Sequence, residues 1–403
     1  MIIPALLVTG IVASENEREE WIATSLERVK EYRQSGEYEE GLPLAEEILK
    51  EAEGLGVPSL QAEAQYQLAL LHHYRGSYEK ARSHLELGLT LARANRLEDL
   101  QADCLNALGI LEWKAGNLHP ATRNLEEALE IWKRIGTSRN LANVHNNLGI
   151  IAYARKDFKA AVNHYRTGIE NLAPEASDRL RASLYSNLAE SLIPLDDLVE
   201  AEQFLTRSLE IEKVEKDPHN LSYTYYNLGE LRARQDDPAE AIDLFQQALQ
   251  LQLSIRNDWA AALTRLKMAE VYVQGGETEK ALAVLSPGYE SIKGLNALTL
   301  LRDYSKLYAE IFEKTGNSGK ATYYRELNQW FTDRMEAADR AALVERDTGP
   351  GPAGDAGSLS SPFVSTMRAA TLGILAIIIG VLFRENLRLR RRIQDAGGGR
   401  LNP

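Results

Sequence analysis

The sequence is poor in the residues that crosslink a chain or build catalytic and metal sites. It holds one cysteine, Cys104, so no disulfide can form within the chain. His72 and His73 are adjacent and point in different directions on a helix, so they cannot share a metal. His145 and His164 could approach across a helix pair, but no carboxylate or cysteine stands at ligand spacing. We predict no catalytic residue, no metal, no cofactor and no enzymatic activity.

An excess of positive charge is also missing. The chain has 46 Lys plus Arg against 58 Asp plus Glu, a formal net charge of −12. A nucleic-acid-binding protein presents a basic face to the phosphates, so this balance argues against such a partner. The Gly319-Lys320 pair is similar to the end of a phosphate-binding loop, but Lys314 stands where that loop needs its first glycine. No small-molecule substrate is inferred.

What the sequence does contain is a repeat of forty residues. The unit 143–165 reads as a helix, a polar turn at Arg155–Asp157 and a second helix. Neither helix can bury its apolar stripe alone, so the units must stack. We expect Gly149 to let another backbone come close. A column of small residues runs through the second helices: Gly41, Ala81, Ala121, Ala161, Ala201, Ala241, Ala281 and Ala321. Another runs through the first helices: Ala69, Gly109, Gly149, Ala189, Gly229, Ala269 and Ala309.

Large residues accompany the small ones at fixed offsets. One column precedes the small residue of the first helix: Leu68, Leu108, Leu148, Leu188, Leu228, Met268 and Tyr308. Another lies four places after the small residue of the second helix: Leu85, Leu125, Tyr165, Leu205, Phe245 and Leu285. This pattern resembles the tetratricopeptide repeat (TPR) in its longer form. The resemblance implies an all-α fold, an α-solenoid forming a right-handed superhelix of about eight helix pairs, which binds other proteins or peptides.

The chain ends differ from the repeats. Segment 1–13 is apolar and fits the hydrophobic part of a secretory signal, although the usual basic start is missing. Residues 14–60 depart from the pattern as a capping repeat would, and 61–345 form the expected solenoid. Gly and Pro are frequent in 346–362, which predicts a linker.

An apolar segment near the C-terminus predicts a membrane anchor. Residues 369–383 are fifteen residues without charge, which as a helix reach about 22 Å, short of the roughly 30 Å hydrocarbon core. Counting from Phe363 gives twenty-one residues if Arg368 turns to the headgroups. Five arginines follow within nine residues. We therefore expect a single-pass transmembrane helix over 363–383 in contact with the lipid bilayer, a cytoplasmic tail over 384–403, and extracytoplasmic (periplasmic) repeats.

Polar residues gather on one face of the first helices. Positions six, three and two before Gly149, and one after it, share this face. In TPR arrays the corresponding face lines a concave groove. Asparagine is a mediocre helix former, but its amide both donates and accepts and so can pair with a peptide backbone. The alternative is that these amides bond one another or water. The candidate groove residues of this kind are Asn106, Asn143, Asn146, Asn147, Asn187, Tyr223, Tyr226 and Asn227.

The same face has two halves of different chemistry. Apolar and aromatic residues in the third and fourth repeats predict an apolar floor: Trp113, Ile150 and Tyr153. Carboxylates follow the small column in later repeats and would attract a basic segment: Glu190, Glu230, Glu270 and Glu310. Arg234, Lys267 and Lys306 lie one turn from three of these carboxylates and would cancel part of their field.

We expect a membrane-anchored scaffold that binds a protein or peptide partner in its groove, similar to the repeat sensor region of bacterial membrane receptors. One alternative is a structural assembly factor of an envelope complex that uses its convex or end surfaces. Another is a tail-anchored adaptor with its repeats in the cytosol.

Overall fold

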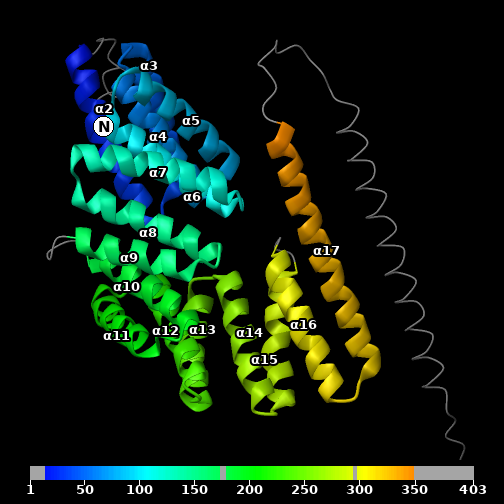
Figure 1. Cartoon of the computed structure of the whole chain (residues 1–403). Helices are drawn as coiled ribbons and strands as arrows, with labels where there is room; N and C mark the ends of the chain where they lie inside the picture. Colours follow the sequence, from blue (N-terminus) through cyan, green and yellow to red (C-terminus); the bar gives the residue numbers. More distant parts are fainter. Residues whose placement is uncertain (1–13, 173–177, 294–296, 349–403) are drawn as a thin grey trace, which may run out of the picture. The chain divides into compact units, whose positions relative to one another are not determined.

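The computed structural model describes residues 14–172, 178–293 and 297–348. Within these residues the chain forms sixteen α-helices and one 3-10 helix (Figure 1). Two units are distinguished, Met1–Met335 and Glu336–Pro403, and the repeats lie in the first. The expected signal segment 1–13 lies outside the described residues, and so does the expected linker 346–362 except for its first three residues, which belong to the last helix.

The helices pair in chain order as antiparallel hairpins. The pairs are α2 (Glu15–Ser35) with α3 (Tyr38–Leu55), α4 (Pro58–Tyr74) with α5 (Tyr78–Ala94), α6 (Glu98–Lys114) with α7 (Leu118–Ile135), α8 (Ser138–Ala154) with α9 (Phe158–Asn171), α10 (Asp178–Leu192) with α11 (Leu198–Glu215), α12 (Pro218–Arg234) with α13 (Pro238–Ser254), α14 (Asp258–Gln274) with α15 (Thr278–Ile292), and α16 (Leu298–Lys314) with α17 (Ser318–Thr348). The 3-10 helix η1 (Ile193–Leu195) extends α10. The predicted all-α array of eight helix pairs is confirmed.

Short turns join the two helices of each pair. At Gly76 the backbone is left-handed, with φ of +80°, and the N–H of Ser77 donates to the carbonyl of His72 at 2.8 Å. These features are typical of a helix terminated by a left-handed residue. Lys156 takes the same conformation, with φ of +61°, at the equivalent position. Asp237 caps α13, because its carboxylate accepts the N–H of Glu240 at 3.0 Å.

The small and large columns meet inside each pair. An ideal Cβ on Gly149 would lie 2.5 Å from Cε1 of Tyr165, and one on Gly229 would lie 2.7 Å from the Phe245 ring. Both rings are buried. The expectation that another backbone approaches Gly149 was wrong, because the aromatic ring of the paired helix occupies that space. The glycines therefore make room for large side chains of the second helices.

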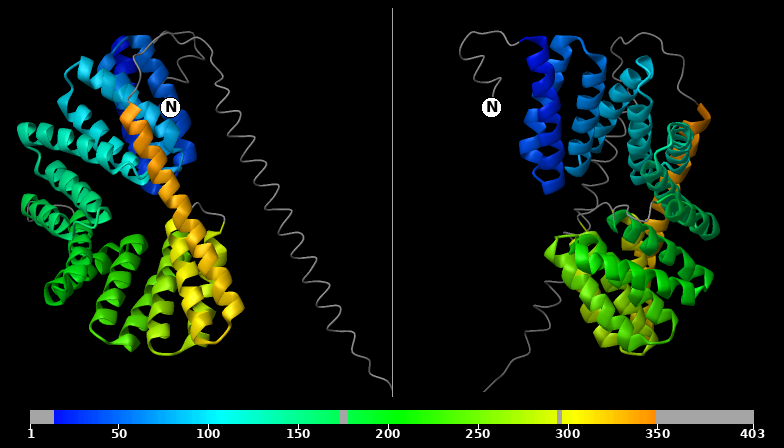
Figure 2. Two further views of the ribbon diagram at one scale, coloured as in Figure 1. Left: turned by 45° about the vertical axis from the view of Figure 1, so that its right-hand side comes forward. Right: turned by 90° about the vertical axis from the view of Figure 1, so that its left-hand side faces the viewer.

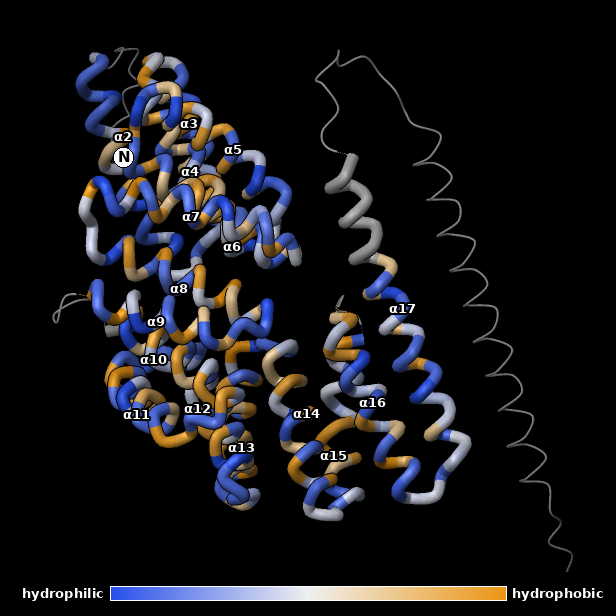
Figure 3. Tube along the Cα trace, in the orientation of Figure 1, coloured by the Kyte–Doolittle hydropathy of each residue, from blue (hydrophilic) through white to orange (hydrophobic). Residues whose placement is uncertain are grey.

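The stack bends in one direction at each step. The first helices of successive pairs (α4 and α6, α6 and α8, and so on) contact each other, whereas the second helices of successive pairs contact each other far less. The first helices therefore lie on the inner side of the bend, and Figure 2 shows the pairs following one another from blue to yellow. Hydrophobic and hydrophilic segments follow one another along each helix (Figure 3), as expected when one face is apolar and the opposite face is polar.

The membrane prediction was wrong. In the part of the chain that the structure describes, no helix is long and apolar enough to cross a bilayer, and 363–383 itself lies outside that part. The C-terminal transmembrane helix and the single-pass membrane location that depended on it are therefore withdrawn. The prediction depended on a short segment, because the fifteen uncharged residues of 369–383 are fewer than the roughly 20 that a spanning helix needs.

Candidate ligand-binding face of the first helices

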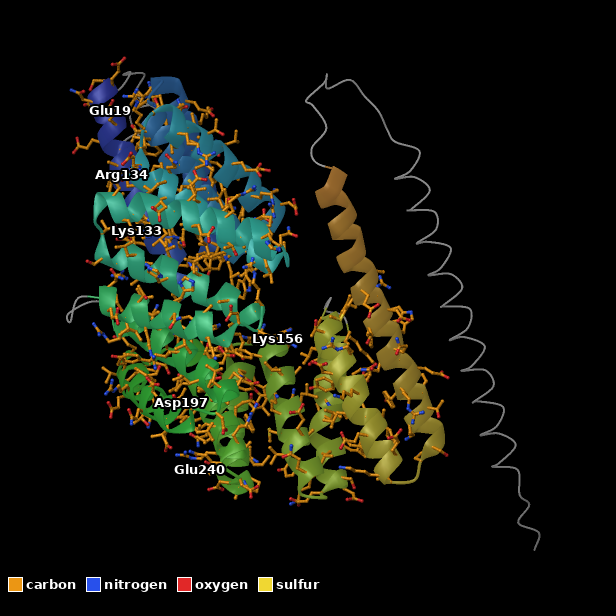
Figure 4. The ribbon with its side chains drawn as sticks, viewed as in Figure 1. Glu19, Lys133, Arg134, Lys156, Asp197 and Glu240 are labelled. Atoms are coloured by element: carbon orange, nitrogen blue, oxygen red, sulfur yellow. The ribbon has the colours of Figure 1, made fainter. Side chains whose placement is uncertain are left out.

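The candidate groove residues lie on α6, α8, α10, α12, α14 and α16, on the inner side of the bend. We call this surface the inner face. Its asparagines, Glu190, Glu230 and Glu270 are half-buried, except Asn227, which is buried. Glu310 is exposed and pairs with Lys314 on its own helix at 2.9 Å. Away from this face, charged side chains such as Lys133 and Glu240 are exposed (Figure 4).

Two asparagine pairs link neighbouring repeats. The amide nitrogen of Asn147 donates to the amide oxygen of Asn106 at 2.8 Å, from α8 to α6. The amide nitrogen of Asn187 donates to the amide oxygen of Asn146 at 2.9 Å, from α10 to α8. The alternative that these amides bond one another is therefore realised. In each pair, the NH2 group of one asparagine and the carbonyl oxygen of the other have no partner among the described residues. The amide of Asn143 has no partner among them either.

The apolar residues of the inner face pack partly into the core. Trp113 packs against the hydrophobic cluster formed by α4 to α8, and Ile150 and Tyr153 pack against the next cluster. The Tyr153 ring also meets Phe158 edge-on at 5.4 Å between centroids. These residues are half-buried, so part of each apolar side chain stays accessible, and the apolar floor itself stays a prediction.

Glu190 is the centre of a polar cluster that joins three first helices. The hydroxyl of Tyr223 on α12 donates to its carboxylate, and the hydroxyl of Tyr153 on α8 bonds to it from the other side. Burial raises the pKa of Glu190 to about 7, and Glu230 adds in the same direction, whereas the two hydroxyls act to lower it. The carboxyl therefore changes its charge near neutral pH.

The cations of the acidic half are arranged differently from expectation. Lys267 lies between two carboxylates, with Nζ 3.2 Å from Glu230 and 3.2 Å from Glu270. Burial acts to lower the pKa of Lys267, but the two carboxylates outweigh it and the pKa is raised. No ion pair of Arg234 or Lys306 occurs in the described part of the chain. One ammonium thus pairs with two of the three half-buried carboxyl groups.

Two predicted site residues lie beneath the surface. Tyr226 is buried and packs against the Phe245 ring at 5.8 Å between centroids. Asn227 is 1% exposed, and neither atom of its amide has a hydrogen-bond partner in the described residues. Sequence reasoning missed a buried polar group behind this face, in which Ser186 and Thr224 approach at 2.5 Å. Its sequence signal was Thr224, which stands where the three preceding repeats carry Cys104, Val144 and Leu184.

Comparisons with known proteins agree with this architecture. A tetratricopeptide repeat model matches residues 98–173, 180–254 and 224–290, and a second tetratricopeptide repeat model matches 26–92. Together these matches cover more than half of the chain. No curated protein matches it.

Several solved structures share the fold at low sequence identity. A Rap protein in complex with competence and sporulation factor has a TM-score of 0.57 and 17% identity, covering 79% of this chain and 99% of that one. The apo quorum sensor NprR from B. thuringiensis has a TM-score of 0.57 and 16% identity, covering 77% and 87%. A STAND protein with a tetratricopeptide repeat sensor from Pyrococcus horikoshii has a TM-score of 0.55 and 15% identity, covering 81% and 55%. Such identities show the fold alone. On the family matches and the paired helices, the chain belongs to the tetratricopeptide repeat family.

Proposed function

We propose that the chain is a scaffold whose inner face binds an extended segment of a protein or peptide partner. The observation that carries this proposal is the pair of asparagine contacts, Asn147 with Asn106 and Asn187 with Asn146, each of which keeps an NH2 group and an oxygen free. An extended backbone presents one donor and one acceptor at every residue, so it complements these groups whatever its side chains. A Rap protein of similar fold was solved with the Phr* peptide, at 12% identity and a TM-score of 0.55.

The acidic half of the inner face favours a segment with a basic side chain. Glu190, Glu230 and Glu270 lie on successive first helices, and Lys267 is the cation that pairs with two of them. The half-buried position of these groups weakens solvent screening, so a lysine or arginine of the ligand would gain more here than on an exposed surface. The apolar half, with Trp113 and Ile150, would take the ligand's hydrophobic side chains.

The proposal is tested with a displayed library of random twelve-residue peptides panned on the full chain. Peptides that are enriched are then synthesised and titrated by calorimetry. We expect Asn147→Ala combined with Asn187→Ala to weaken their binding about tenfold, from ~0.5–1.5 kcal/mol for each hydrogen bond lost. The control is Asn163→Ala, because Asn163 is exposed on a second helix.

Circular dichroism first establishes that each variant folds. Affinity that is unchanged in the double variant would refute binding on the inner face and favour an outer or terminal surface. The basic preference is tested separately by panning Glu230→Gln, whose peptides should lose the lysine and arginine enrichment seen with the wild type. Enrichment that persists contradicts the basic preference and leaves backbone binding intact.

A further inference from the structure

The junctions between successive pairs provide an internal comparison. Where a second helix meets the next first helix, three buried positions recur in each repeat. They are Gly88, Ala92 and Cys104 at α5/α6; Ala128, Trp132 and Val144 at α7/α8; Gly168, Leu172 and Leu184 at α9/α10; and Ser208, Glu212 and Thr224 at α11/α12. The first three junctions are apolar. The fourth consists of two hydroxyl residues and a glutamate.

The polar residues of the α11/α12 junction form a closed network. The Ser208 hydroxyl lies 3.0 Å from that of Ser186 on α10 and donates to the carbonyl oxygen of Ala182 at 2.8 Å. Ser208 Oγ is also 3.2 Å from Oε1 of Glu212. Glu212 is 2% exposed, and its Oε2 has no hydrogen-bond partner in the described residues. A carboxyl that is half-satisfied inside a stack costs free energy that an apolar residue there would not.

Among the described residues, no cation forms an ion pair with Glu212. The charged group that acts on it is another carboxylate, Asp217 at the start of α12, which pairs with Arg179 of α10 at 3.4 Å. The hydroxyl of Thr224 on α12 bonds to Glu212 and lies 2.5 Å from the hydroxyl of Ser186 on α10, so both of these hydroxyls contribute no charge. An ionised Glu212 is therefore stabilised by hydroxyl groups alone while the junction is closed, but by water when it opens.

We infer that the α11/α12 junction is the point at which the repeat stack opens, and that ionisation of Glu212 promotes this opening. The inference stands whether or not the inner face binds a peptide. Opening here separates α10 from α12 and so parts the hydroxyl of Tyr223 from Glu190, the contact that joins these helices on the inner face. At the same three positions the neighbouring junctions carry Gly168, Leu172 and Leu184 on one side and Ala248, Gln252 and Thr264 on the other, none of which is charged.

The pH range follows from burial. Burial raises the pKa of Glu212 to about 7, Asp217 adds to this, and the hydroxyls of Thr224 and Ser208 oppose it. The closed junction thus binds the proton more tightly than the open one, where the ordinary value of 4.5 applies. The stability that the protonated Glu212 gives to the closed form is fully present below pH 4.5 and is lost as the pH rises towards 7. Linkage between these two values makes opening about tenfold more frequent at pH 8 than at pH 6.

Hydrogen exchange of the full chain, read by mass spectrometry at pH 6 and pH 8, tests this inference. After scaling for the intrinsic chemical rate, amides of α11 and α12 should exchange about tenfold faster at pH 8 in the wild type. Because Glu190 contacts α12 and its pKa is also about 7, the comparison is made in a Glu190→Gln background, where Glu212→Gln should abolish this difference. Gln is the residue that the next junction carries at the same position, where Thr264 donates to Gln252 at 2.8 Å.

The converse variant is the matched control. Gln252→Glu should add pH-dependent exchange at α13 and α14, since it places a glutamate at the equivalent buried position. Scaled exchange at α11 and α12 that is equal at both pH values in the wild type would overturn the inference. So would a pH dependence that survives Glu212→Gln in the Glu190→Gln background. If Gln252→Glu fails to fold, the comparison of Glu190→Gln with the Glu190→Gln, Glu212→Gln double variant decides alone.

Discussion

Replacing Gly149 by alanine probes the contact between the two helices of one pair. The added Cβ would lie 2.5 Å from Cε1 of Tyr165, and that ring is 1% exposed, so it has little room to move. Overpacking of this kind costs about 1–3 kcal/mol. Alanine recovers about 1 kcal/mol through its higher helix propensity. Since a 2.5 Å contact with a buried ring places the cost in the upper part of that range, at about 2–3 kcal/mol, the net expectation is a loss of about 1–2 kcal/mol in the free energy of unfolding.

Other repeats of the same chain supply the compensating change. Where the first helix carries alanine, at Ala69, Ala189 and Ala269, the second helix carries leucine. Tyr165→Leu alone should leave a cavity beside Gly149 and cost about 2 kcal/mol. In Gly149→Ala combined with Tyr165→Leu, the new methyl group fills that space. The double variant should therefore be more stable than the sum of the single changes by at least about 1 kcal/mol.

Urea unfolding followed by circular dichroism measures this cycle. Because repeat arrays unfold in segments, hydrogen exchange of α8 and α9 should accompany it to localise the effect. The matched control is Ala189→Gly, which removes a methyl group against the buried Leu205 and should destabilise. Additive single changes, or a Gly149→Ala variant as stable as the wild type, would show that the ring yields and that this reasoning is wrong.

Two further predictions concern buried polar contacts. Tyr304→Phe removes the hydroxyl that donates to the carbonyl of Ala262 at 2.7 Å in the core; we expect a loss of about 1–3 kcal/mol in urea unfolding, with no effect from Tyr323→Phe, whose ring is 58% exposed. The Nδ1 atoms of His145 and His164 lie 3.3 Å apart, burial lowers the pKa of His145 to about 4, and the pKa of His164 is also lowered. The folded pair binds protons less tightly than the unfolded chain, so stability should fall as the pH drops from 6.5 towards 4. The next repeat carries Tyr185 and Phe204 at these positions. His145→Tyr combined with His164→Phe should therefore reduce the loss of thermal stability at low pH. An unchanged pH profile would contradict the role of the two histidines.

Periodicity and residue type alone were sufficient to predict the helix pairs. A small residue recurring every forty positions beside large apolar ones requires stacking, because no single pair can bury its own stripe. This argument located the turns, the column that contains Gly149 and the face that carries Asn147. The same local reasoning failed for the membrane anchor, because the uncharged segment 369–383 is shorter than a helix that spans a bilayer.

The partners of each polar side chain were decided only by the tertiary structure. Spacing along one helix placed Asn147 and Asn187 on the inner face, but their bonds run to the preceding first helices, to Asn106 and Asn146. Asn227 occupies the equivalent position and is nevertheless buried without a partner. The distance between helices depends on the side chains packed between them at each junction, so sequence periodicity specified which residues share a face, whereas packing determined which of them meet.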